Sequence, residues 1–466
     1  MSLFKPLALL HLPWILAEAV SYHPVLSWFI AWTGSFLIFY LTILSPFNIN
    51  QQDCSSTQKV MRPIILIQII FAGFMCCTSI FYFTDQLIHT YAPDNIVLAK
   101  CQRLSLLAHI ALVSGFIIST KTNNVVKYKY TMTVEDLSIK ICVVAYLTAL
   151  LLNKFPSMIQ FKYNLLSVGA CCGTFTLISG FANKNIKLIV FGSIVFGFNV
   201  VESTLTGYKE SIIINFILLG FIAFPYFKKM VLIFSVPVIG MLFYILPTFT
   251  TIIRLQSWIE KKPIEQARSQ AYLSLLDQDN QDEITFNNWK FLTDRSSEIG
   301  MFGKFVKHVP DYRPYYGWEI LENSIIALIP RAFWQDKPIT EKVAMQRVYD
   351  AGVVNPASVI SAKSRPVVDG YLMAGAPGVY ISILIYGLLT QWLCNNAERL
   401  FGGYEMGCII IFNGLFQQLW RGNNFEFLLN NIVYGYILMT LIFFLLKQFK
   451  ILIPVNYENN PHLSIV

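Results

Sequence analysis

Long apolar runs separated by short polar connections dominate the chain. Eleven of them approach the roughly 20 residues that an α-helix needs to cross a bilayer. These runs are Val25–Leu44, Pro63–Phe83, Leu104–Ser119, Leu137–Leu152, Tyr163–Phe181, Leu188–Val201, Ser211–Tyr226, Met230–Thr250, Met373–Cys394, Met406–Leu419 and Leu428–Leu446. A further run, Leu7–Val20, contains Pro13 and Glu18, so a span and an interfacial helix are both open for it. The pattern predicts an all-α, polytopic integral membrane protein.

Basic residues in alternate connections predict the orientation of these helices. If Leu7–Val20 spans, one set of connections carries most of the short-loop cations, as the positive-inside rule asks of cytoplasmic loops. This set holds Lys59, Arg62, Lys121, Lys127, Lys129, Lys184, Lys187, Lys228, Lys229, Arg399, Lys447 and Lys450. We therefore predict about 12 spans with a cytoplasmic N-terminus, and residues 251–372 on the outer side.

The outer segment divides the chain into three parts. Residues 1–250 are predicted as N-terminal transmembrane helices, 251–372 as a large external loop and 373–466 as C-terminal transmembrane helices. Within the loop, Trp318, Leu321, Ile325 and Leu328 recur at helical spacing. This spacing predicts an amphipathic helix along the membrane surface.

Composition agrees with a membrane protein and narrows the chemistry. Hydrophobic residues make up 55% of the chain and charged residues 13%, where soluble domains carry about 25% charged residues. No basic patch on a soluble face is visible, which argues against nucleic acid as a partner. The nine cysteines lie mostly in apolar runs and the six histidines are scattered. This pattern argues against a disulfide framework and against a catalytic metal held by His or Cys, and leaves a carboxylate-bound divalent ion open.

A Pro-Arg-x-x-Trp-x-x-Lys-Pro arrangement in the loop is the strongest candidate for chemistry. Arg331, Trp334 and Lys337 lie between Pro330 and Pro338, which restrict the backbone at both edges. An arginine offers a planar fork that suits phosphate, and a lysine adds a point charge. The segment is suited to holding an anion beside a membrane.

Two further arginines lie at predicted outer helix ends. Arg254 follows the span before the loop, either as an arginine that reaches the interface or as one aimed at an anion in a cavity. Arg421 precedes Gly422 in the last outer connection, and the glycine would allow close backbone approach to a ligand. Glu426 is available as an ion-pair partner for Arg421, which is the structural alternative.

Aromatic and charged residues cluster between the loop's middle and the next span. Tyr and Trp stack on sugar rings and carboxylates bind sugar hydroxyls, although the same aromatics could anchor the loop in the interface. The candidates are His308, Asp311, Arg313, Tyr315, Trp318, Glu319, Glu322 and Tyr371. Near Tyr371, three glycines open the following helix, either for close packing or for a helix N-terminus open to an anion.

The chain resembles the Wzy-type O-antigen and exopolysaccharide repeat-unit polymerases of bacteria. The resemblance rests on many spans interrupted by one large external loop, on Pro330-Arg331 through Trp334 to Lys337-Pro338, on Gly370-Tyr371-Leu372, and on Arg421-Gly422. It covers the C-terminal half by motif and the N-terminal half by topology. It differs where Met373-Ala374 stands in place of the aromatic that the family often shows.

The resemblance implies a GT-C-like membrane glycosyltransferase in the bacterial cytoplasmic membrane. Such enzymes join undecaprenyl-pyrophosphate-linked oligosaccharides without a cofactor, beside membrane lipid, a repeat-unit flippase and a chain-length regulator. Arginines can stabilise the leaving pyrophosphate without a metal. For that role we predict Arg254, Arg331, Lys337 and Arg421, with His308, Asp311, Glu319 and Glu322 as candidate bases.

Two alternatives remain. An O-antigen ligase would share the fold and donor and use another acceptor. A transporter or flippase for lipid-linked sugars would need broken helices or charges at mid-membrane in both halves.

Overall fold

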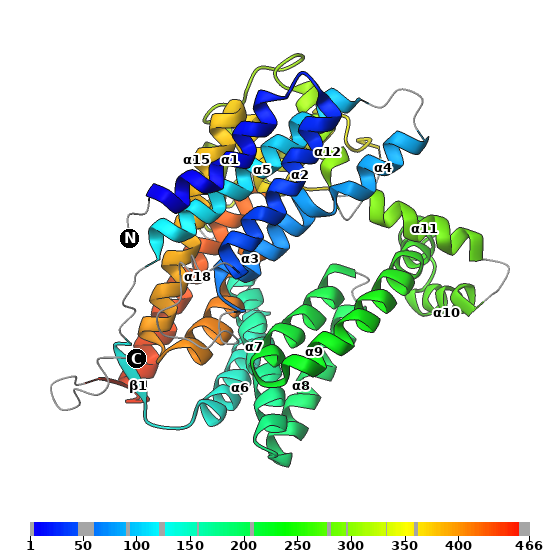
Figure 1. Ribbon diagram of the computed structural model, residues 1–466. Coiled ribbons are helices and arrows are strands. Elements are labelled where there is room, and N and C mark those ends of the chain that lie inside the picture. The colour runs from blue at the N-terminus through cyan, green and yellow to red at the C-terminus, as the bar shows by residue number, and fades with distance from the viewer. Residues whose placement is uncertain are drawn as a thin grey trace.

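A computed structural model describes residues 4–44, 60–89, 94–120, 126–155, 158–205, 209–276, 281–294, 297–331, 333–357 and 362–455. Figure 1 shows that these residues are mostly helical. The two strands among them, β1 (Tyr128–Tyr130) and β2 (Leu452–Pro454), pair antiparallel, with Lys129 opposite Ile453. Apart from this short strand pair, the predicted all-α class is confirmed.

The first group of helices surrounds α5, which is the most deeply buried helix of the bundle. Its members are α1 (Phe4–Ala19), α2 (Pro24–Phe39) continued by the π-helix η1 (Tyr40–Leu44), α3 (Pro63–Ala72), η2 (Gly73–Cys77), α4 (Ser79–His89) and α5 (Asn95–Ser119). α1 packs antiparallel along α2. Two contacts show this: Ser27 donates to the Ala17 carbonyl, and Gly34 lies against Pro13. The uncertain run Leu7–Val20 is therefore a helix packed in the bundle, although it has only 16 residues.

A second group extends from α6 to α9, from the lower middle toward the right of Figure 1. It comprises α6 (Val134–Leu152), α7 (Ile159–Ala182), α8 (Ile186–Leu205) and α9 (Lys209–Arg254). The 46 residues of α9 do not form one straight helix, because Phe227 has the non-helical angles φ −130° and ψ 44°. A Cβ on Gly220 would lie 4.0 Å from Val231, so the chain turns back on itself near Phe227. This agrees with the prediction of two separate apolar segments, Ser211–Tyr226 and Met230–Thr250.

The segment 251–372, predicted as the external loop, is mostly helical where the structure describes it. Its elements are η4 (Leu255–Ile259), α10 (Ile264–Leu276), α11 (Gln281–Asp294), α12 (Ile299–His308), α13 (Glu319–Leu328) and α14 (Thr340–Asp350). In Figure 1, α10 and α11 project to the right, away from the bundle. Trp289 of α11 nevertheless reaches α4, where its indole nitrogen donates to Asp85 at 2.7 Å.

The C-terminal helices complete the bundle around α5. They are α15 (Pro366–Leu400), η6 (Tyr404–Phe412), α16 (Asn413–Leu415), α17 (Gln417–Arg421) and α18 (Phe425–Gln448). α15 begins seven residues before the predicted span Met373–Cys394. α15 and α5 come into backbone contact at Gly115 and Gly387: a Cβ on Gly115 would lie 2.5 Å from the Leu384 carbonyl oxygen. Glycine at both positions allows the two helices to pack this closely.

The connections between helices contact one another in two groups, one at each end of the helix bundle. At the first, which we call the inner end, Arg62 pairs with Glu398 at 3.1 Å, and the Lys127 amide donates to the Arg399 carbonyl. At the second, the outer end, Arg103 pairs with Glu18 at 2.8 Å. Lys307 pairs there with Asp94 at 2.9 Å, and this ion pair lowers the pKa of the Asp94 carboxyl against the opposing effect of burial. Residues from connections predicted on the same side of the membrane thus meet one another at each end.

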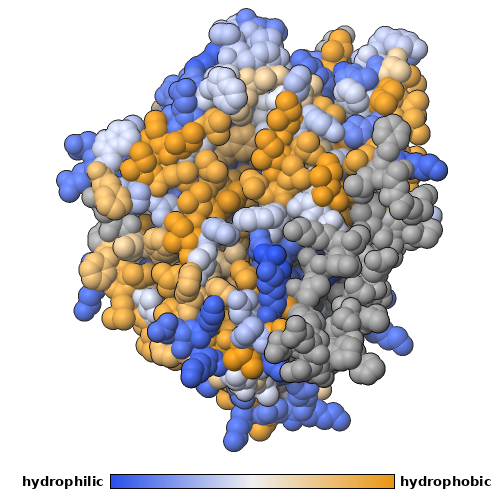
Figure 2. Space-filling model, turned by 90° about the vertical axis from the view of Figure 1, so that its left-hand side faces the viewer, coloured by the Kyte–Doolittle hydropathy of each residue, from blue (hydrophilic) through white to orange (hydrophobic). Residues whose placement is uncertain are grey.

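By length and composition, eight of the described helices could cross a membrane. They span Pro24–Ile43, Pro63–Ile88, Asn95–Ser119, Ile159–Ala182, Ile186–Thr204, Ser211–Met241, Pro366–Leu400 and Phe425–Gln448. Figure 2 shows a mostly hydrophobic zone across the middle of one face, with hydrophilic residues gathered toward its top and bottom. The protein is therefore a helical membrane protein.

The predicted amphipathic helix exists as α13, and its apolar face is partly exposed, with Trp318 and Ile325 exposed and Leu321 and Leu328 half-buried. Trp318, at its N-cap, is 71% exposed and Ile325 is 52% exposed, whereas Ile320 and Ala327 on another face are buried. α13 packs along α18, where the Tyr434 hydroxyl donates to the Leu328 carbonyl at 2.8 Å. A partly exposed apolar face on a helix packed along an apolar helix is suited to contact with lipid.

Candidate functional site

A break in α15 positions the loop that follows α12. Ala374 and Gly375 have non-helical angles, and Gly375 has φ +65° and ψ −142°, a region that essentially only glycine adopts. The break frees carbonyl groups of the helix, and the Tyr316 and Gly317 amides donate to the Leu372 and Met373 oxygens at 2.9 and 3.1 Å. The sequence Gly375-Ala-Pro thus creates a docking point for the loop.

The glycine-rich start of α15 serves close packing. A Cβ on Gly378 would collide with the Gly370 carbonyl, and one on Gly370 would lie 2.6 Å from the Ser382 hydroxyl. The short segment before the break therefore folds against the helix after it. Two interpretations of the three glycines were open, close packing and a helix N-terminus that binds an anion. These contacts agree with close packing.

Three charged side chains from three helices meet in the interior beside this break. The Arg347 guanidinium, on α14, donates to both Glu426 oxygens at 2.6 and 3.0 Å and lies 3.4 Å from Asp369. Their exposed fractions are 3%, 0% and 0%. Burial alone would lower the pKa of Arg347, but Asp369 and Glu426 raise it above its ordinary value. The guanidinium therefore stays charged.

Hydrogen bonds to Asp369 tie this cluster to the turn before α18, while the Arg347 Nε atom has no hydrogen-bond partner within the described residues. Asp369 accepts from the Ser364 hydroxyl at 2.6 Å and from the Phe425 amide at 2.9 Å. The cluster consequently joins α14, α15 and α18 at the outer end. The hydrogen bonds to Asp369 offset part of the cost of burying these charges.

Arg365, the residue after Ser364, binds the turn that follows α17. Its guanidinium donates to both carboxylate oxygens of Glu298 and to the carbonyls of Arg421 and Gly422, the latter two at 3.2 and 2.9 Å. Gly422 has φ +67°, as expected for the glycine that ends a helix. The backbone of the predicted site residue Arg421 is thereby fixed by another arginine.

Next to this turn lies a buried amide without a protein partner. Asn424 is fully buried, and within the described chain neither its side-chain Oδ1 nor its side-chain Nδ2 forms a hydrogen bond. The same holds for the indole nitrogen of Trp420. Buried polar atoms normally have partners, so these two side chains mark a place beside Arg421 where the described protein atoms leave polar groups unsatisfied.

A cavity of about 340 Å³ opens between α13 and α14. Arg313 lines it and pairs with Glu319 and Asp350, both at 3.1 Å, with its guanidinium 3.9 Å from the centre of the Tyr316 ring. The complete lining is Arg313, Tyr316, Glu319, Asn323, Lys342, Val343, Gln346, Arg347 and Asp350. Cations, carboxylates, amides and an aromatic ring in one space suit a ligand that carries hydroxyl groups and negative charge.

The predicted Pro330–Pro338 segment forms a turn, and its cations differ in their surroundings. The Trp334 amide donates to the Pro330 carbonyl at 3.3 Å. Arg331 is exposed and donates to the Gln335 carbonyl, and Trp334 is 39% exposed. Lys337 instead points inward, and its ammonium donates to the Ala327 and Ile329 carbonyls at the end of α13. Burial, with a smaller contribution from Arg331, lowers the pKa of Lys337.

The other predicted residues are divided between the cavity and its surroundings. Arg313 and Glu319 line the cavity. Asp311, Tyr315, Trp318 and Glu322 are exposed at the outer end, and His308 stacks on Tyr312. Tyr371 is buried, donates to the Val309 carbonyl and lies beside Lys100. α9 ends at Arg254, whose side chain lies outside the described residues.

The structure shows a different ion-pair partner for Glu426. It also shows residues at the candidate site that the sequence analysis missed. Glu426 binds Arg347, so it is not simply the ion-pair partner of Arg421. Arg347, Arg365, Lys342 and Asp350 were not predicted. Lys342, Arg347 and Asp350 follow an apolar-polar pattern typical of any surface helix, and the pattern carries no sign of buried carboxylates 22 and 79 residues away.

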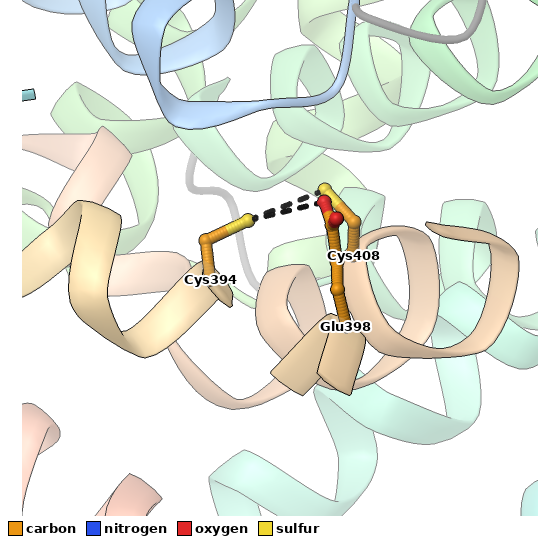
Figure 3. Close-up of side chains that lie close together, drawn as sticks. All are labelled: Cys394, Glu398 and Cys408. Carbon is orange, nitrogen blue, oxygen red and sulfur yellow. Dashed lines mark hydrogen bonds between the residues drawn. The ribbon is translucent and has the colours of Figure 1, made fainter. Parts of the chain in front are cut away.

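One cluster of possible metal ligands is compact enough among the residues that the structure describes: Cys394, Glu398 and Cys408. It lies at the inner end, away from the cavity, and Figure 3 shows its three side chains converging. The eight cysteines in the described part of the chain are free thiols and seven are buried, in agreement with packing in apolar runs.

These features define a class, a helical membrane protein with a charged cavity between two helices of its longest polar segment. Residues 12–454 match the model of a family described as a domain of unknown function, DUF8712, and the chain belongs to this family. No curated protein and no solved structure matches the chain.

Proposed function

We propose that the protein is a membrane glycosyltransferase that polymerises undecaprenyl-pyrophosphate-linked oligosaccharide repeat units at the outer face of the bacterial cytoplasmic membrane. The observation that carries the proposal is the α13–α14 cavity. Its lining offers carboxylates and amides for sugar hydroxyls, Tyr316 for a sugar face, and Arg313 and Lys342 for negative charge. The neighbouring α13 presents an apolar face suited to the lipid tail of such a substrate.

The proposed reaction uses the cations at the outer end. A hydroxyl of one lipid-linked unit attacks the anomeric carbon of the chain carried by another, the bond to the pyrophosphate oxygen breaks, and undecaprenyl pyrophosphate leaves. Arg331 and Arg421, with Arg254 and Lys337 as further candidates, would stabilise the negative charge that develops on the leaving group. Glu319 is the candidate base with a place in the cavity lining; His308, Asp311 and Glu322 lie outside it.

The broken helix favours an enzyme over a transporter. A transporter of lipid-linked sugars would use broken helices around a site at mid-membrane, in both halves of the chain. In α15 the break lies eight residues after the helix start at Pro366, and the Tyr316–Gly317 segment of the outer loop fills it. The break thus serves to attach the outer segment.

Cells from which the protein is removed distinguish the proposal from its rivals. Loss of a polymerase leaves lipid carrier with a single repeat unit on the outer face of the membrane. Loss of a flippase leaves the same lipid on the inner face, and loss of a ligase leaves finished polymer that is not transferred to its acceptor. Analysis of lipid-linked sugars on each side of the membrane separates the three outcomes.

The proposed topology has 12 spans, a cytoplasmic N-terminus and residues 251–372 outside. A reporter inserted at Asn287 in α11 should therefore behave as periplasmic, and one after Lys450 as cytoplasmic, because the inner-end connections carry most of the short-loop cations. A phosphatase reporter, active only outside, and a fluorescent reporter, active only inside, measure this. The opposite pattern would reverse the orientation and remove the cavity from the lipid-linked substrate.

A further inference from the structure

A turn through two glycines brings Cys408 back onto the end of α15. Cys394 and Glu398 lie one helical turn apart on α15, and Gly402 and Gly403, with φ +70° and +108°, reverse the chain before η6. The Cys394 sulfur then lies 3.7 Å from the Cys408 sulfur and 3.7 Å from a Glu398 oxygen (Figure 3). All three side chains are buried, with exposed fractions of 1%, 6% and 0% for Cys394, Glu398 and Cys408.

The separation of the two sulfurs suits a tetrahedral metal ion. Two Zn–S bonds of about 2.3 Å at a tetrahedral angle hold their sulfurs about 3.8 Å apart. The 3.7 Å between Cys394 and Cys408 agrees with that value and exceeds the roughly 2 Å of a disulfide. The ligand atoms of the three residues all lie within 4.8 Å of one another.

Neighbouring groups hydrogen-bond to the candidate ligands and fix their orientation, as they do in known protein metal sites. Arg62 donates to both Glu398 oxygens, at 3.2 and 3.1 Å, and so fixes the carboxylate, as hydrogen bonds to ligating carboxylates do in metal sites. The Met61 carbonyl oxygen lies 3.4 Å from the Cys408 sulfur and offers a fourth donor. Cys408 belongs to a π-helix, a conformation that is often found at functional sites.

Charge balance favours a divalent cation here. With neutral thiols, Glu398 and Arg62 form a neutral pair. With a divalent cation and two thiolates, the cluster is neutral again, because the ion replaces two protons. The interior therefore has no net charge in either state, which keeps the cost of desolvation low.

We propose that Cys394, Cys408 and Glu398 bind a zinc ion that connects the end of α15 to η6 and to the segment before α3. Binding takes up one Zn²⁺ and releases the two thiol protons. The site is structural, since its ligands are buried and Cys394 lies eighteen residues beyond Ala376, about 27 Å of helix from the break in α15. It is independent of the proposed enzymatic activity.

Cobalt reports directly on such a site. Full-length protein in detergent, reduced and stripped with a chelator, is titrated with Co²⁺ and followed by absorption spectroscopy. We expect the visible bands of tetrahedral cobalt and the near-ultraviolet thiolate-to-cobalt band, saturating at one ion per chain and lost when Zn²⁺ is added. Cys394→Ser and Cys408→Ser should abolish the thiolate band. Cys171→Ser, at an equally buried cysteine outside the cluster, should retain it.

A second measurement needs no variant and so does not depend on variant folding. Calorimetric titration of the stripped wild-type protein with Zn²⁺, in buffers of different ionisation enthalpy, counts released protons, and we expect about two per ion. Absence of the thiolate band in the wild-type protein, its retention in both serine variants, or zinc binding without proton release would each overturn the proposal.

Discussion

Replacing Arg347 by Gln should lower the free energy of unfolding by about 3–5 kcal/mol, the cost of leaving a buried charge without its partner. The change leaves Asp369 and Glu426, both fully buried, facing each other without a cation. Because the cluster joins α14, α15 and α18, we expect loss of protein from the membrane as well as a lower melting temperature in detergent.

Arg313→Gln is the matched control. It also removes an arginine from two carboxylates, but its partners Glu319 and Asp350 are 51% and 25% exposed, and exposed pairs contribute about 0–1 kcal/mol. Adding Asp369→Asn and Glu426→Gln to Arg347→Gln should restore part of the stability, because the repelling carboxylates are then gone. Equal melting temperatures for Arg347→Gln and Arg313→Gln would contradict this account of the cluster.

Arg331→Lys and Arg421→Lys should each reduce long polymer on the order of a hundredfold, the effect of losing one preorganised donor in the transition state. Lysine keeps the charge and loses the planar fork that binds phosphate at two points. Both variants should accumulate normally. Arg331 is exposed and makes one backbone contact, while Arg365 holds the turn at Arg421 through backbone carbonyls.

Polymer length on gels, together with membrane abundance, measures this effect. If the two arginines bind one pyrophosphate, the double variant should be little worse than either single one, because groups that act as a unit are not additive. Arg399→Lys, at the inner end, is the control and should leave polymer unchanged. Normal-length polymer from either outer variant would remove that arginine from the site and direct attention to Arg254, Lys337 and Arg313.

The apolar pattern was sufficient to predict most of the helices. A run such as Tyr163–Phe181 has no other way to satisfy its backbone in a membrane than to form a helix, and α7 covers it. The pattern was less informative where the chain bends, since the breaks at Phe227 and Gly375 depend on a few residues with special backbone angles.

The candidate site was harder to predict because its partners come from distant parts of the sequence. Glu426 was expected to be available for Arg421, five residues away, and it binds Arg347, 79 residues away. Lys337 was chosen as a phosphate ligand, and it donates to carbonyls at the end of α13, which attract a cation as well. Cys394 and Cys408 show no metal-ligand spacing along the chain, because the Gly402–Gly403 turn alone brings them together.

Turnover by the purified protein tests the proposed function most directly. Full-length protein in detergent or in vesicles is supplied with undecaprenyl-pyrophosphate-linked repeat units, and products are resolved by length. We expect chains of two or more repeats and one undecaprenyl pyrophosphate released for each new linkage. Unchanged single repeats, while the same preparation moves the lipid-linked units across the vesicle membrane, would contradict the polymerase account.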